Sequence, residues 1–336
     1  MDTFNLKSHN HRFNKKLSKQ LNQLSKLDNY HVILALLQDW SIIFFSILIT
    51  LHCTYLYPLC LLVIGSRQRA LSTIFHDAAH GRVAINKTIN LVAGTVFSGF
   101  WVFQSINQYK SSHVKNHHGD LGNKIIDPDY QYYIGEGLYN SELTAKDFLF
   151  RHVVAVLMLF KAPSYLAYLI KNRVSSAKLY PFEFAVMLLG WAGVFTLAYH
   201  YNSLQLIILY WLVPFLTTHT IIGYFIELAE HYPLLGASNQ VIELSRNRFS
   251  HWLEALFFSM HNENYHLVHH LRPTIPFWNM VKAHKVMMHD EKYSKLNQGF
   301  GGIFLSSNTV KPLIVKLASE GIGNVHTKIP TITEQH

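Results

Sequence analysis

Long apolar runs alternate with short polar or charged segments along most of the chain. The apolar runs cover residues 31–65, 90–103, 153–170, 182–198 and 204–226. A helix crosses the hydrocarbon core of a bilayer with about 20 apolar residues, and several of these runs reach or approach that length. The pattern therefore predicts an all-α integral membrane protein.

The first run is long enough for a hairpin of two helices, provided that the second helix continues beyond Gly65. Pro58 and the uncharged segment His52-Cys53-Thr54 suit a short turn on the outer side of the membrane. Arg67 and Arg69 follow, and basic residues concentrate on the cytoplasmic side of membrane proteins. We therefore expect the second helix to end on the cytoplasmic side.

The composition agrees with membrane embedding. Of the 336 residues, 49% are hydrophobic and 15% are charged, whereas soluble domains carry roughly 25% charged residues. The net charge of +9 comes from basic residues that flank apolar segments and do not interleave with stacking aromatic residues, so we expect no nucleic-acid partner. We divide the chain into a basic cytoplasmic N-terminal tail at 1–30, a membrane domain at 31–295 and a polar C-terminal tail at 296–336.

Three histidine clusters lie between and after the apolar runs. They are His76-Asp77-Ala78-Ala79-His80, His113-Val114-Lys115-Asn116-His117-His118 and His266-Leu267-Val268-His269-His270. Residues three and four apart share one face of a helix, so each cluster directs two or three ring nitrogens toward one point. Eight imidazoles are expected to converge.

This donor set points to a particular kind of metal centre. Imidazole suits iron, zinc, copper and nickel, whereas magnesium and calcium prefer oxygen ligands. A single zinc ion takes about four ligands, so eight histidines fit two first-row metal ions better than one. Iron is the one of these metals that activates O₂ on nitrogen and oxygen ligands without cysteine.

The motifs HDAAH, HVKNHH and HLVHH, in this order and interleaved with apolar spans, resemble the three histidine boxes of the integral-membrane fatty acid desaturase and hydroxylase superfamily. The resemblance extends from about Trp40 to about Pro276. It implies a non-haem di-iron oxygenase fold with two Fe ions as cofactors. The metal ligands that it implies are His76, His80, His113, His117, His118, His266, His269 and His270. No catalytic residue beyond the metal ligands is expected.

Clusters that share metal ions must lie on one side of the membrane, so an even number of spans must separate them. We therefore expect the run 90–103 to be interfacial or re-entrant. Arg151 precedes the run 153–170, Lys161 interrupts it near its middle, and Lys171, Arg173 and Lys178 follow it, so we assign it to an interfacial helix.

The two remaining runs, 182–198 and 204–226, then form a second hairpin around an uncharged turn. The expected fold has four transmembrane helices in two hairpins and a cytoplasmic helical cap that carries the three boxes. Both termini are expected in the cytoplasm.

Beyond the eight box histidines, a di-iron centre needs a ninth or tenth donor if one or both ions take five ligands. We favour His231, because the pair Glu230-His231 resembles the matching segment of membrane alkane monooxygenases and sphingolipid desaturases. His219, Asn262 and His261 remain alternatives.

Metal-bound imidazoles usually donate their second N–H to a carboxylate or a carbonyl. We expect Asp77, Asp120 and Glu230 to accept these hydrogen bonds. Asp127 and Asp129 are expected to face solvent.

The leading interpretation is an O₂-dependent enzyme that introduces a double bond into a fatty acyl chain of a lipid-like substrate. Trp101, Phe103 and Tyr224 are candidates for contacts with that chain. The sequence has no His-Pro-Gly-Gly motif, no cysteine pattern for an iron–sulfur cluster and no dinucleotide-binding fingerprint. We therefore expect a separate electron donor of the ferredoxin or cytochrome type, docking at the basic cytoplasmic face.

Two other functions remain open from the sequence alone. A hydroxylase or ketolase acting on an alkyl or carotenoid-like substrate would use the same metal chemistry. A divalent-metal membrane transporter would also be rich in histidine, but its sites would lie near the middle of the bilayer.

Overall fold

Helices make up all the regular structure in residues 8–320, which are the residues that the computed structural model describes, apart from the side chains of 169, 172–177 and 320. The chain divides into two units. Unit 1 comprises residues up to Lys26, Ser112–Ala155 and the chain from Phe225 onward, and unit 2 comprises Leu27–Ser111 and Val156–Tyr224. The predicted all-α class is confirmed.

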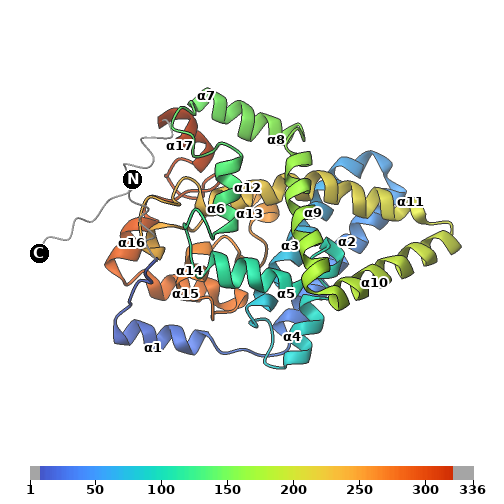
Figure 1. Ribbon diagram of the computed structural model, residues 1–336, viewed down its shortest axis with the longest axis horizontal. Helices are drawn as coiled ribbons and strands as arrows, with labels where there is room; N and C mark the ends of the chain where they lie inside the picture. Colours follow the sequence, from blue (N-terminus) through green and yellow to red (C-terminus); the bar gives the residue numbers. More distant parts are fainter. Residues whose placement is uncertain (1–7, 321–336) are drawn as a thin grey trace, which may run out of the picture. The chain divides into compact units, whose positions relative to one another are not determined.

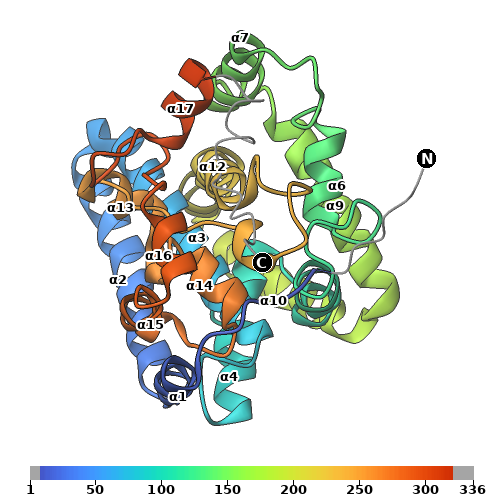
Figure 2. The same ribbon diagram turned by 90° about the vertical axis from the view of Figure 1, so that its left-hand side faces the viewer.

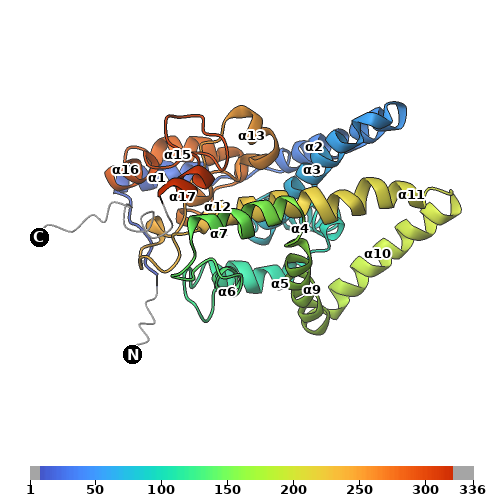
Figure 3. The same ribbon diagram turned by 90° about the horizontal axis from the view of Figure 1, so that it is seen from above.

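Unit 2 begins with the two helices that the first apolar run predicts. Helix α2 (His31–His52) and helix α3 (Tyr57–Ala79) are joined by the short helix η1 (Thr54–Leu56). The two long helices pack side by side (Figure 3). As expected, the second helix continues well beyond Gly65, and it ends within the first histidine cluster.

The last two apolar runs also form neighbouring helices. Helix α10 (Pro181–His200) turns back at a tight connection into α11 (Leu204–Ile207), at the right edge of Figure 1. From α11 the helix continues through η5 (Ile208–Leu212) and η6 (Phe215–His219) into α12 (Thr220–His231).

Three helices are long and apolar enough to cross a membrane, namely His31–His52, Pro181–His200 and Leu204–His231. Two bent helix pairs raise the number to five if each pair is one span. These pairs are Lys87–Val102 with Ile106–His117, and Ala145–Leu157 with Ala162–Tyr168. They include the two runs that we expected to be re-entrant or interfacial. Three to five apolar helices fit a multi-pass membrane protein.

Close packing in unit 2 holds the bent segment after α4 (Lys87–Gly94) against α3. A Cβ atom at Gly94 would lie 2.2 Å from the Cβ of Ala78, and one at Gly99, the first residue of η2 (Gly99–Val102), would lie 2.5 Å from Cδ2 of Phe75. Only glycine therefore permits this approach. The contact fixes the part of α3 that carries the first histidine cluster.

Tryptophan side chains bind the carbonyl groups of the same bent segment. The indole N–H of Trp191 donates to the carbonyl of Phe100 over 2.9 Å, and that of Trp211 donates to the carbonyl of Trp101 over 2.9 Å. Trp40 donates to the carbonyl of Phe97 over 3.1 Å. Carbonyl groups outside a regular helix need such donors in an apolar environment. Trp101 and Phe103, which we considered for substrate contacts, belong to this aromatic cluster.

Unit 1 carries most of the histidines on short helices. Helix α1 (Lys15–Leu24) buries Leu17 and Leu21 and lies beside α15 (Met280–Met287), as Figure 2 shows. The helix η3 (Lys110–His117) starts in unit 2 and ends in unit 1. Further helices of unit 1 are α6 (Pro128–Gly135), η7 (Val241–Glu243), α13 (Trp252–Phe258), η8 (Met260–Asn262), α14 (His266–Leu271), η9 (Phe277–Asn279), α16 (Glu291–Asn297) and α17 (Leu313–Glu320).

The α2–α3 pair contains a buried ion pair that should control its stability. Arg67 donates to Asp39 over 3.2 Å, and the side chain of Asp39 is 0% exposed. We expect Asp39→Ala to lower the free energy of unfolding by about 3–5 kcal/mol, because it leaves a buried charge without compensation. The double variant Asp39→Ala/Arg67→Met should recover more than half of this loss in thermal unfolding of the detergent-solubilised protein. Equal destabilisation by the single and the double variant would contradict this explanation.

Candidate metal centre

The second histidine cluster lies on a widened helical turn. In η3 the N–H of His118 donates to the carbonyl of His113 over 2.9 Å, which is a hydrogen bond between residues five apart. Such π-type turns are rare and often occur at functional sites. The wide turn brings His118 over His113, with their Nε2 atoms 3.1 Å apart.

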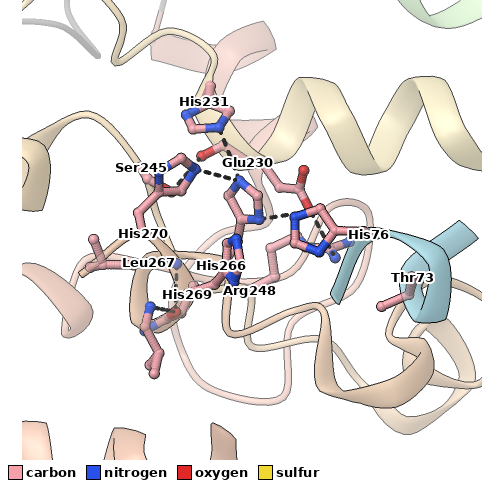
Figure 4. A network of polar contacts seen from close by, with 12 residues as sticks. Thr73, His76, Glu230, His231, Ser245, Arg248, His266, Leu267, His269 and His270 are labelled. Atoms are coloured by element: carbon pink, nitrogen blue, oxygen red, sulfur yellow. Dashed lines mark hydrogen bonds and ion pairs between the residues drawn. The ribbon is translucent and has the colours of Figure 1, made fainter. Parts of the chain in front are cut away.

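The third cluster occupies α14, and all three of its histidines are buried. His231 is the last residue of α12 and is 2% exposed. Figure 4 shows the rings of His231, His266 and His270 directed toward one another. The Nε2 atoms of His231 and His270 each lie 3.0 Å from Nε2 of His266.

Four histidines of unit 1 form one buried group. His117, His231, His266 and His270 each offer a ring nitrogen, and these four nitrogens lie within 4.8 Å of one another. Three of the residues were predicted as ligands from the boxes, and His231 was the favoured extra donor. The structure therefore brings His231 together with members of the second and third boxes.

Hydrogen bonds on the outer ring nitrogens fix how these imidazoles are protonated. Nδ1 of His231 donates to the carbonyl of Leu244 over 2.9 Å, since a carbonyl can only accept. Nδ1 of His117 faces Asp127 at 2.9 Å, and Nδ1 of His266 faces Glu230 at 3.4 Å. With the protons held on Nδ1, the Nε2 atoms of His231 and His266 present lone pairs to the centre of the group.

This arrangement fits a metal ion. Four imidazole nitrogens at metal bonds of 2.0–2.1 Å in tetrahedral geometry would lie roughly 3.4 Å apart, close to the 3.0 Å separations in this group. Within residues 8–320, Nε2 of His117 is buried and has no hydrogen-bond partner. The outer nitrogens of His117, His231 and His266 face acceptors, as those of metal-ligating histidines normally do. The donor set suits a first-row metal ion.

A second set of three histidines lies beside the first in unit 1. His118 stands between His113 and His269, with Nε2 separations of 3.1 Å and 3.0 Å. Its ring also stacks on that of His270, with centroids 4.3 Å apart. All the predicted ligands of the second and third boxes thus lie in one continuous cluster.

The first box lies in unit 2, at the end of α3. The rings of His76 and His80 are neighbours with centroids 5.0 Å apart, as expected for residues four apart on a helix. Asp77 lies 2.8 Å from Nδ1 of His76, which is the role that we predicted for it.

The alternatives to His231 have other surroundings. The amide of Asn262 donates to the carbonyl of Phe277 over 3.0 Å, and the ring of His261 packs against Phe277 with centroids 5.2 Å apart. His219 lies in unit 2, where its ring stacks on Phe215.

The acid that holds His117 is Asp127, a residue that we expected to face solvent. Its side chain is 0% exposed and also accepts hydrogen bonds from the N–H groups of Gly122, Asp129 and Tyr130. Asp127 therefore caps the N-terminus of α6 and orients a histidine at the same time. An Asp directly before a Pro is typical of the start of a helix. This pattern could have predicted that Asp127 caps α6.

Charge and burial shift the pKa values of His117 and Asp127 in opposite directions. Burial alone would lower the pKa of His117, but the carboxylates of Asp127 and Asp129 raise it to about 9. Burial alone would raise the pKa of Asp127, but His117 and the N–H of Gly122 lower it. The pKa of His270 lies well below its usual value because of burial and the neighbouring imidazoles. A metal ion that binds Nε2 of His117 therefore displaces a proton.

Comparison with known proteins agrees with the histidine pattern. The sequence profile of the family described as Fatty acid desaturase matches residues 54–301. All nine predicted ligands lie within this range. The dihydrorhizobitoxine desaturase of Bradyrhizobium elkanii is 34% identical to the chain over 333 residues, covering 94% of each protein.

The position of Asp127 leads to a matched pair of variants. We expect Asp127→Asn to weaken metal binding by about 10–100-fold, because partners of metal-bound imidazoles contribute that much to affinity. Asp120 was predicted for the same role, but among the described residues its side chain makes no hydrogen bond to a histidine. Asp120→Asn is therefore the control and should retain the wild-type affinity. Titration of the purified protein with Fe²⁺ against a chelator measures both. Equal losses in the two variants would show that Asp127 has no special role.

Proposed function

The chain belongs to the fatty acid desaturase family, and on this basis we propose that it is an O₂-dependent desaturase of an acyl chain. The reaction removes one hydrogen from each of two adjacent carbons and forms a double bond between them. O₂, two electrons and two protons are consumed, and together with the two substrate hydrogens they give two molecules of water.

The observation that supports this proposal most is the group of four buried histidines, three of which have an outer nitrogen that faces an acceptor on Leu244, Asp127 or Glu230. We propose that His117, His231, His266 and His270 hold one iron ion. His113, His118 and His269 would hold the second, together with His76 and His80. When bound, the two iron ions would supply the activation of O₂ and the cleavage of unactivated C–H bonds.

The recruitment of His76 and His80 rests on the order of the three boxes in the family. Asp77 lies 2.8 Å from Nδ1 of His76. His76 therefore has an acceptor beside its Nδ1, as His117 and His231 have. In this proposal the protein positions the metal ions and the substrate, and no further side chain acts on the reacting carbons. Positioning matters because small displacements of the reacting atoms cost large factors in rate.

The same metal chemistry serves hydroxylases, so the product distinguishes the two reactions. Family membership and a relative that is named a desaturase support desaturation. The same two findings argue against the alternative function of a divalent-metal transporter.

A second candidate substrate comes from the relative. That protein is named for dihydrorhizobitoxine, and its identity to this chain extends over nearly the full length of both. A small substrate of this kind is therefore a candidate beside a fatty acyl chain.

We propose four transmembrane helices, namely α2, the first part of α3, α10 and the continuous helix from α11 to α12. The histidine boxes and both termini would then face the cytoplasm, which labelling of single cysteines from either side of the membrane tests. Electrons would come from a separate ferredoxin or cytochrome that docks on this side.

The metal assignment can be tested without turnover. We expect about two iron ions per chain after anaerobic purification of the wild-type protein. His269→Ala should lose at least one iron and all activity while it still inserts into the membrane. His289→Ala, an exposed histidine of unit 1, is the matched control and should keep both. A His269→Ala variant with full iron content and activity would refute the ligand assignment.

The reaction can be tested by its products. Reduced protein with O₂ and an electron donor should convert a fatty acyl substrate into a product that is lighter by two hydrogens, detected by gas chromatography and mass spectrometry. Dihydrorhizobitoxine should be offered in parallel, and the preferred substrate identifies the class. An alcohol in place of an alkene would establish hydroxylation instead.

A further inference from the structure

Unit 1 contains a strongly basic cavity that the metal centre does not use. Its volume is about 130 Å³. Its cationic lining residues are Arg246, Arg248, Lys295, Lys311 and Lys316. Among the side chains that the structure describes, which exclude that of residue 320, no Asp or Glu lines it.

The two arginines lie deep in the cavity and keep donors without partners. Arg246 is 7% exposed and donates one hydrogen bond, to the carbonyl of Tyr232, while its guanidinium lies over the ring of Phe300 at 5.6 Å. Arg248 is 1% exposed and donates to the carbonyl of Phe258 over 2.9 Å. In the described part of the chain, Nε of both arginines is buried and without a hydrogen-bond partner.

Glu230 supplies one negative charge beside Arg248, in an ion pair that is long. Glu230 lies 3.7 Å from Nη2 of Arg248, which is beyond hydrogen-bond distance, and it also faces His266 at 3.4 Å. Burial lowers the pKa of Arg246 to about 10. By contrast, Lys292, on the same helix α16 as Lys295, pairs with Glu243 at 2.6 Å. A buried guanidinium with unused donors is costly unless an anion occupies the site.

The lysines extend the cavity toward solvent. Lys295 and Lys311 are exposed, whereas the arginines are buried, so the positive charge runs from the surface to the floor of the cavity. A glycine-rich turn at residues 299–302 lines one wall. A Cβ atom at Gly302 would lie 2.1 Å from the carbonyl oxygen of Leu305, so this turn cannot carry a larger residue without moving.

From this geometry we propose that the cavity is a binding site for a phosphate group. One water molecule needs about 10–15 Å³ of such space, so the cavity holds a phosphate and the first atoms attached to it. Two arginine forks and three lysines match a group with close to two negative charges and several acceptor oxygens better than a single carboxylate. The phosphate can be a soluble anion or the head group of a lipid-like molecule.

The test uses the full-length protein in detergent and needs neither metal nor turnover. Inorganic phosphate, titrated by calorimetry at constant ionic strength, should bind saturably to one site. Lys295→Gln/Lys311→Gln changes only exposed residues and should weaken the affinity at least tenfold. Lys282→Gln/Lys285→Gln removes the same charge from exposed positions on α15 that do not line the cavity, and should leave the affinity unchanged.

Equal weakening in the two double variants, or no saturable binding to the wild type, would overturn the proposal. A parallel titration with dihexanoyl phosphatidic acid identifies the source of the phosphate. Binding at least tenfold tighter than that of inorganic phosphate supports the site with a lipid head group as its ligand, and equal binding supports it with a soluble anion. Because the readout is binding, the result does not depend on whether the protein is a desaturase.

Discussion

The fold of unit 1 depends on bringing imidazole lone pairs close together inside the protein. A neutral histidine has one donor and one acceptor nitrogen, so lone pairs that face one another at 3.0 Å repel unless a cation or a proton lies between them. The structure fixes this arrangement from outside the group. The loop after η7 supplies the carbonyl of Leu244, the start of α6 supplies Asp127, and the end of α12 supplies Glu230. Three segments distant in the sequence are thereby held in place by the requirements of one site.

Much of this arrangement could be predicted from the sequence. The lengths of the apolar runs predicted the helices α2, α3 and α10 and the continuous helix that ends in α12. This was possible because the thickness of the bilayer sets the number of apolar residues that a spanning helix needs. The spacing within each box predicted which histidines lie together, because a helix repeats every 3.6 residues. Both predictions use local information, which a single sequence contains.

The features that could not be predicted depend on contacts distant in the chain. The run from Lys110 to His117 has no periodicity that distinguishes a π turn from an α turn, so the edge-to-face contact of His118 with His113 could not be foreseen. Asp127 was expected in solvent because acids usually are. Its burial follows from the surrounding N–H donors, which only the fold assembles. The division into two units was likewise invisible, since each unit is built from separate parts of the chain.

The end of α12 links the metal centre to the basic cavity. Successive residues on a helix point about 100° apart, so Ala229, Glu230 and His231 face three directions. Ala229 lines the cavity, His231 belongs to the histidine group, and Glu230 lies between Arg248 and His266. At about 4 Å and an effective dielectric constant near 20, a pair of opposite charges attracts by roughly 4 kcal/mol. Glu230 carries a single negative charge, whereas the lining of the cavity carries five positively charged side chains. The position of Glu230 therefore orients a predicted metal ligand and leaves the cavity with its excess of positive charge.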